Sequence, residues 1–108
     1  MNSGIASLVL LSVLGQAKEP MYGYQIAKLL NDKSGNTSLM KQGALYPVLR
    51  SLASSGLLES QVEPSVSGPP RRYYTITAAG RETLEIWTEV WNQTKSFVEN
   101  ILKGTGNV

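Results

Sequence analysis

The C-terminal quarter of the sequence carries one long stripe of side chains at helical spacing. These residues recur at steps of four, three, four and three, at Trp87, Trp91, Thr94, Val98 and Ile101. The spacing predicts a helix from 78 to about 103, with Thr77 as its N-cap and Gly104 as a stop signal. About 25 helical residues extend roughly 37 Å, more than a domain of about 75 residues covers. The excess apolar surface predicts a second copy of the chain, that is, a homodimer.

A second apolar segment runs from Ile5 to Leu14 and is interrupted only by Ser7 and Ser12. A helix that is apolar nearly all round is buried on more than one side, so this segment also predicts a partner surface. A secretory signal peptide has a Lys or Arg before its apolar run, and none precedes this one. The run is also shorter than the roughly 20 residues that span a bilayer. We therefore expect a cytoplasmic protein that does not associate with a membrane.

The residue types exclude most catalytic chemistry. The 108 residues include no Cys and no His, so the chain has no disulfide, thiolate nucleophile, imidazole base or Cys/His zinc site. Glu82, Glu85 and Glu89 lie at spacings typical of one solvent face of a helix. We expect no enzyme activity, no metal and no cofactor. Ten Lys and Arg against eight Asp and Glu give a net charge of +2, and the basic excess lies before Arg81.

The middle of the chain predicts two further helices and a hairpin. The helices span Tyr22 to Lys33 and about 41–55, with Gly56 as the C-terminal cap of the second. If the second helix proper begins at Gly43 or Ala44, Pro47 is among its first four amides, which have no partner within the helix. Strands are predicted over 57–62 and 71–76, joined by a long mobile tip from 63 to 70.

This order of elements is mainly α with a β wing: a winged helix-turn-helix with an additional long C-terminal dimerisation helix. We assign residues 1–77 to a DNA-binding domain, whose first helix also joins the dimer, and residues 78–108 to the dimerisation helix and a short tail. In such a fold the third helix enters the major groove of double-stranded DNA and the hairpin reaches the neighbouring groove or phosphates.

Seven residues are candidates for DNA binding. Four lie on the polar face of the third helix, one begins the second helix and two lie on the tip side of the hairpin: Lys41, Gln42, Tyr46 and Arg50; Tyr22; Arg71 and Arg72. Each also has a structural interpretation. Tyr46 can pack under the wing, the arginines can form salt bridges along the strands, and Gln42 and Arg50 can be solvated helix surface. We expect Tyr24, Tyr73 and Tyr74 to pack in the core and wing.

Four motifs that follow one another along the sequence make this interpretation more specific. Over about residues 5 to 95 the sequence resembles the PadR family of bacterial transcriptional regulators, at Met21–Ile26, Gly43–Leu52, Gly56–Glu59 and Gly68–Gly80. The resemblance implies a homodimeric regulator, usually a repressor, that binds an inverted-repeat operator. In the compact subclass it also implies a planar aromatic effector held between paired tryptophans at the dimer centre. Trp91 matches that tryptophan, and Trp87 lies one turn earlier.

The sequence departs from the family pattern at two DNA-binding positions. Tyr22 replaces a frequent His, and Lys41-Gln42-Gly43-Ala44 replaces Ser-Pro-Gly-Thr at the start of the third helix. Lysine is a poor N-cap beside the positive helix end, so we expect Lys41→Ser to stabilise the free protein and weaken operator binding. The alternative function is a winged-helix dimer that acts as a protein-interaction module without DNA readout.

Overall fold

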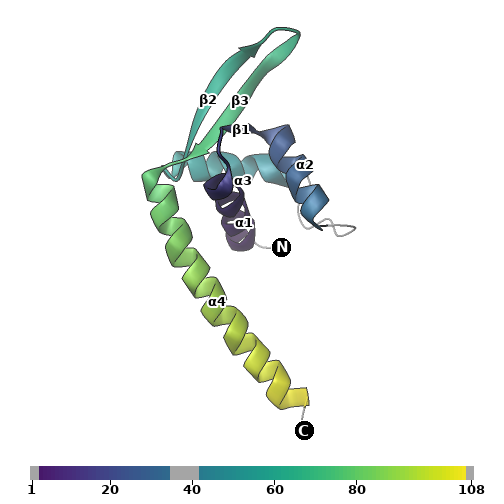
Figure 1. The fold of residues 1–108 in the computed structure, drawn as a ribbon, viewed down its shortest axis with the longest axis vertical. Coiled ribbons are helices and arrows are strands. Elements are labelled where there is room, and N and C mark those ends of the chain that lie inside the picture. The colour runs from purple at the N-terminus through teal and green to yellow at the C-terminus, as the bar shows by residue number, and fades with distance from the viewer. Residues whose placement is uncertain (1–2, 35–41, 107–108) are drawn as a thin grey trace.

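The computed structural model describes residues 3–34 and 42–106, and over these residues the chain forms four α-helices and three β-strands (Figure 1). In chain order they are α1 (Ser3–Gln16), β1 (Met21–Tyr22), α2 (Gly23–Ser34), α3 (Gln42–Ser54), β2 (Leu58–Ser65), β3 (Gly68–Ile76) and α4 (Ala78–Gly106). Three helices, a two-stranded hairpin and a long last helix confirm the predicted winged helix-turn-helix.

α1 lies at the centre of the packed part of the molecule, in contact with α3, β3 and α4. Its Leu10, Leu11 and Leu14 are buried, and the core also contains Ile26, Leu45, Leu49, Leu52, Leu58, Tyr74 and Ile76. The chain's own elements therefore supply much of the cover that the apolar sequence of α1 predicts. Ile5, in the first turns of α1, remains 40% exposed. Apolar surface for a partner is left mainly at that end of the helix.

The three strands form one antiparallel sheet in the order β1-β3-β2. The prediction that Tyr22 opens the second helix is wrong, because Met21 and Tyr22 pair with Tyr74 and Tyr73 of β3 and α2 begins at Gly23. Two residues are too few to show an alternating pattern. This strand is determined by its partner rather than by its own sequence.

The hairpin is longer than predicted. The prediction of a mobile tip over 63–70 is wrong, because β2 continues to Ser65, β3 begins at Gly68, and only two residues connect them. The strand pairing shifts between Glu63 and Ser65, on either side of a proline that has no amide to donate. Pro69 and Pro70 lie in β3 beyond the residues paired with β1, where the strand is a sheet edge that tolerates proline.

The predicted caps of α3 and α4 are confirmed. Gly56 has a φ of 80°, and the Leu57 amide donates to the Leu52 carbonyl over 3.0 Å, which closes α3 in a Schellman motif. Thr77 is the single residue between β3 and α4. Its Oγ1 accepts a hydrogen bond from the Gly80 amide over 2.9 Å and donates one to the Gly56 carbonyl over 2.7 Å. The cap therefore joins the wing, α3 and α4 at one point.

Pro47 lies inside α3, five residues after Gln42. The prediction that its missing amide falls among the first four of the helix is therefore wrong, and α3 tolerates the loss of one internal hydrogen bond.

α4 extends beyond the rest of the molecule. It ends at Gly106, three residues after the predicted end, and Figure 1 shows its C-terminal half projecting away from the other elements. Residues 88–104 are all exposed, and the molecule measures 63 × 31 × 22 Å. Among the described residues, no helix combines the length and apolar character needed to cross a membrane.

Candidate nucleic-acid interface

The start of α2, the exposed side of α3 and the edge of β3 meet around a hollow of about 320 Å³. Five of the seven predicted DNA-binding residues line it: Tyr22, Tyr46, Arg50, Arg71 and Arg72. Gln42 is the first residue of α3, and Lys41 lies outside the described residues. The fold thus brings together side chains from three separate segments of the sequence.

Tyr46 links α3 to α2. Its half-buried ring lies against Gly23, so closely that a Cβ atom at that position would overlap the ring. The absence of a side chain at Gly23 therefore lets the two helices of the helix-turn-helix approach each other. Arg50, one turn after Tyr46, is exposed.

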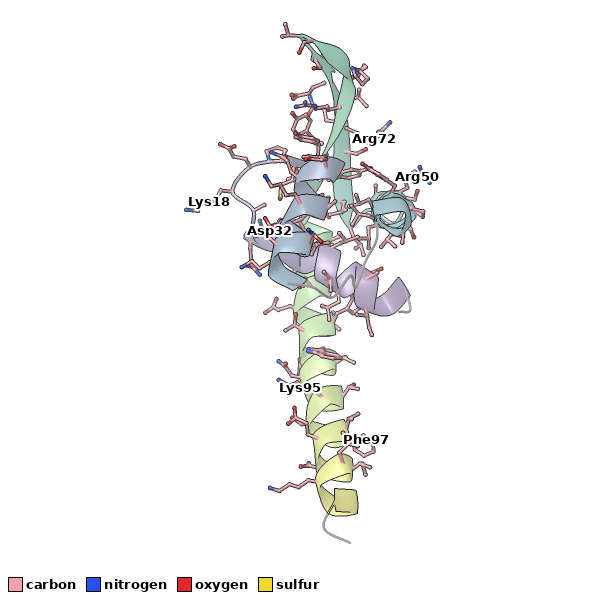
Figure 2. All side chains as sticks on the ribbon, turned by 90° about the vertical axis from the view of Figure 1, so that its right-hand side faces the viewer. Lys18, Asp32, Arg50, Arg72, Lys95 and Phe97 are labelled. Carbon is pink, nitrogen blue, oxygen red and sulfur yellow. The ribbon has the colours of Figure 1, made fainter. Side chains whose placement is uncertain are left out.

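The two wing arginines belong to opposite faces of the hairpin. Successive side chains in a strand alternate between faces, and Arg71 and Arg72 pair with Glu63 and Val62 of β2 within the paired region. Arg72 shares its face with the buried Tyr74 and donates from Nη1 to Ser60 Oγ over 3.1 Å. Figure 2 shows Arg72 and Arg50 on the same side of the molecule. Arg72 therefore extends the polar side of α3 onto the wing.

The pKa of Tyr74 is affected by burial and by the charges of Arg72 and Arg50. Burial raises the pKa of its phenol above the ordinary value of 10.0, while the guanidinium groups of Arg72 and Arg50 act in the opposite direction. Both arginines are therefore close enough to Tyr74 for their charges to act on it, one from the wing and one from α3. This is the positive potential that a phosphate backbone requires.

Arg71 takes part in a separate cluster at the start of α2. Its guanidinium carbon lies 4.5 Å from the centroid of the Tyr22 ring. That ring meets Tyr73 edge-on at 5.4 Å and stacks on Tyr24 at 6.4 Å. The prediction that Tyr24 packs in the core is wrong, because its side chain is 59% exposed and lines the hollow.

The helical periodicity of α2 predicts that Tyr24 lies away from the core. Ile26 and Leu30 define the inward face of α2, and Tyr24, two residues before Ile26, falls on nearly the opposite side of the helix. Pro70 and Tyr74 also line the hollow without having been predicted there. Neither has a local pattern that distinguishes a site residue from a strand residue.

The wing also has an acidic side. A second hollow, of about 700 Å³, is lined by Glu19, Pro20, Glu59, Ser60, Gln61, Glu63, Tyr73 and Thr75. Of the described residues that line it, none is basic. Glu59 and Glu63 share this face of the hairpin with Arg71, so the hollow repels a polyanion from the part of the face beyond Arg71.

The two tryptophans lie beside α1. Trp91 is 45% exposed and borders two hollows with mainly apolar linings, one of about 690 Å³ between α1, α2 and α4 and one of about 330 Å³ between α1 and α4. Trp87 is half-buried, packs on the core and lines only the smaller hollow. The predicted ligand residues thus share one hollow.

Comparison with known proteins identifies the family. The family described as transcriptional regulator PadR-like matches residues 10–86. A PadR-family transcriptional regulator from Eggerthella lenta is 34% identical, with a TM-score of 0.75 over 92% of this chain and 84% of that one. A PadR-like transcriptional regulator from Bacillus cereus is 33% identical, with a TM-score of 0.74 over 92% of each chain. A transcriptional regulator from Clostridium thermocellum is 27% identical, with a TM-score of 0.80 over 90% and 92%. The chain belongs to the PadR-like family of transcriptional regulators.

Proposed function

We propose that this regulator is a cytoplasmic homodimer that represses its own or a neighbouring operon, of an efflux or stress type, by binding an inverted-repeat operator. A small aromatic effector bound at the dimer interface releases it from DNA. The observation that carries DNA binding is the convergence of Arg50, Arg71 and Arg72 on one hollow between α2, α3 and the wing.

In this proposal α3 lies in the major groove. Arg50 and the hydroxyl of Tyr46 reach phosphate oxygens or base edges, and Lys41 and Gln42 act at the start of the helix. Arg72, on the same side as Arg50, follows the backbone beside the groove. The acidic hollow, lined by Glu59 and Glu63 on the hairpin face of Arg71, favours contact near α2 and α3 and disfavours contact over the rest of that face.

The dimer rests on α1 and α4. In the single chain α4 exposes a set of large apolar side chains: Ile86, Val90, Trp91, Phe97, Val98, Ile101 and Leu102. Figure 2 shows Phe97 and Lys95 on opposite sides of this helix, so α4 has an apolar and a polar side. Residues 78–108 form the dimerisation element, and residues 1–77 form the DNA-binding domain, with Ile5 of α1 adding to the interface.

The effector site lies where Trp91 borders the apolar hollows. An exposed indole on a largely apolar wall favours a flat aromatic ligand, which stacks on it. Trp87 lines the smaller hollow and forms its inner wall. Tryptophan fluorescence titrated with planar aromatic compounds tests this part of the proposal. We expect quenching that Trp91→Ala abolishes, together with weaker DNA binding. If no compound quenches the tryptophan fluorescence, the proposed effector site is wrong. The proposal of DNA binding then depends only on the DNA-binding experiment.

Fluorescence anisotropy with duplex DNA from upstream of the protein's own gene tests DNA binding. We expect the wild-type dimer to bind, and Lys41→Ser and Arg50→Gln each to weaken binding while the dimer stays intact. Lys95→Gln is the control, because it removes one positive charge from α4, far from the hollow. A wild-type dimer that binds no duplex supports the protein-interaction module instead.

A further inference from the structure

The Tyr22 ring is held in place from several directions. β1 pairs Tyr22 with Tyr73, and the two rings meet edge-on at 5.4 Å. Tyr24 also stacks with it, with an angle of 17° between the rings. The Tyr22 amide donates to Oε1 of Gln25 over 3.0 Å, which is half of a capping box at the start of α2. The ring is therefore a fixed platform rather than a loose surface side chain.

The Arg71 guanidinium lies over this platform, 4.5 Å from the ring centroid. A cation over an aromatic face is attracted by the electron density of the ring, but its charge is not neutralised as it is by a carboxylate. The arginine therefore keeps its full charge and its hydrogen-bond donors while losing much of its rotamer freedom. This combination prepares an arginine for a planar anionic ligand such as a phosphodiester.

We propose that Tyr22 is a positioning residue for Arg71, and that Arg71 binds a DNA phosphate beside the start of α2. This inference rests on the proposed function and refines it, since Tyr22 then acts through Arg71 rather than by its own contact with DNA. Arg72 belongs to the opposite face of the hairpin and serves a different phosphate with Arg50. In this arrangement Arg71 and Arg72 contact the DNA backbone from opposite faces of β3.

The size of the effect follows from the cation–π contact. An exposed contact of this kind favours the positioned arginine by about two- to fivefold, so over two protomers its loss weakens binding by up to roughly 4- to 25-fold. We therefore expect Tyr22→Leu to weaken operator binding by that factor. Tyr22→Phe keeps the ring and retains most of the wild-type affinity. Arg71→Gln weakens binding at least as much as Tyr22→Leu, and the salt slope becomes shallower by about 0.9 for each phosphate that the variant no longer neutralises.

A pair of double-mutant cycles tests the coupling, with binding of duplex from upstream of the gene measured at several salt concentrations. Tyr22→Leu combined with Arg71→Gln is expected to be little worse than Arg71→Gln alone. Tyr22→Leu combined with Arg72→Gln is the matched control, and there the two losses of affinity multiply. Losses that multiply in both cycles overturn the inference. A Tyr22→Phe variant as weak as Tyr22→Leu also overturns it, because the hydroxyl then contacts DNA directly.

Nuclear magnetic resonance of the free dimer gives a readout that needs no DNA. Ring currents of Tyr22 shift the Arg71 side-chain protons upfield, and we expect this shift in the wild type and Tyr22→Phe but not in Tyr22→Leu. Its absence from the wild type overturns the platform. A wild type that shows the shift but binds no duplex overturns the proposed function and, with it, the phosphate contact. A wild type that binds DNA without loss of affinity in Tyr22→Leu overturns only the present inference.

Discussion

Tyr74 couples the core to the charged cluster. Burial raises the pKa of its phenol, so folding favours the protonated form. This stabilisation is complete below the ordinary tyrosine pKa of about 10 and is lost as the pH rises through the higher pKa of the folded state. We expect the free energy of unfolding, measured in urea between about pH 8 and pH 11, to fall less steeply in Tyr74→Phe than in the wild type. Equal slopes in the two proteins would contradict the assignment.

Gly23 is the residue at which packing and the proposed site meet. A methyl group there overlaps the Tyr46 ring, so we expect Gly23→Ala to cost about 1–3 kcal/mol in unfolding free energy and to weaken DNA binding. Gly104→Ala is the matched control: nothing lies near its added Cβ, and alanine favours the helix by up to about 1 kcal/mol. Urea denaturation compares the two. A Gly23→Ala protein as stable as the wild type would show that the ring moves aside without cost.

Among the elements, those with their own periodicity or cap could be predicted. The Gly56 and Thr77 caps locate the ends of α3 and α4 because a positive φ and a side-chain acceptor are local requirements. β1 could not be predicted, since Met21 and Tyr22 form a strand only against β3. Pro69 and Pro70 suggest a loop, yet they lie in a strand whose open edge needs no amide there.

α4 carries a prediction about assembly. Phe97 is 65% exposed in the single chain, on the apolar side of the helix. Burying it in both protomers is worth about 3–6 kcal/mol, so Phe97→Asp should raise the dimer dissociation constant by at least about 100-fold. Light scattering after size-exclusion chromatography measures this. Asn92→Asp, which adds the same charge at an exposed polar position of α4, should leave the dimer intact. Loss of the dimer in both variants would point to charge rather than to the apolar side.

The candidate site could be predicted only in part. The sequence and its family resemblance identify Tyr46, Arg50 and the wing arginines as one group, and the fold brings them to one hollow. They do not separate Arg71 from Arg72, although the twofold alternation of a strand requires opposite faces. The contact between Arg71 and Tyr22 joins residues 49 positions apart. It depends on β1, a strand that no sequence pattern predicts.

At the scale of the whole molecule, the proposed two-fold dimer presents two copies of α3. We expect an operator with half-sites centred about one helical turn apart, roughly 34–36 Å. Inserting about five base pairs between them turns one half-site to the opposite side of the duplex and should abolish tight binding. Footprinting and anisotropy on the altered duplexes measure this. Binding unaffected by the insertion would mean that each protomer reads DNA independently.

The hydrogen bonds at Thr77 couple the orientation of α4 to that of the wing. Hydrogen bonds from Thr77 to Gly56 and from Arg81 to the Gly15 carbonyl, at 2.7 and 3.3 Å, leave no flexible linker between β3 and α4. The helix is about 43 Å long and the hairpin about 30 Å, so a tilt of about 5° moves the far end of α4 by about 4 Å and the tip by about 3 Å. In the proposed dimer, a small shift where two α4 helices meet therefore also moves the wing, by about 1.5 Å at Arg71 and Arg72, five to six residues from Thr77.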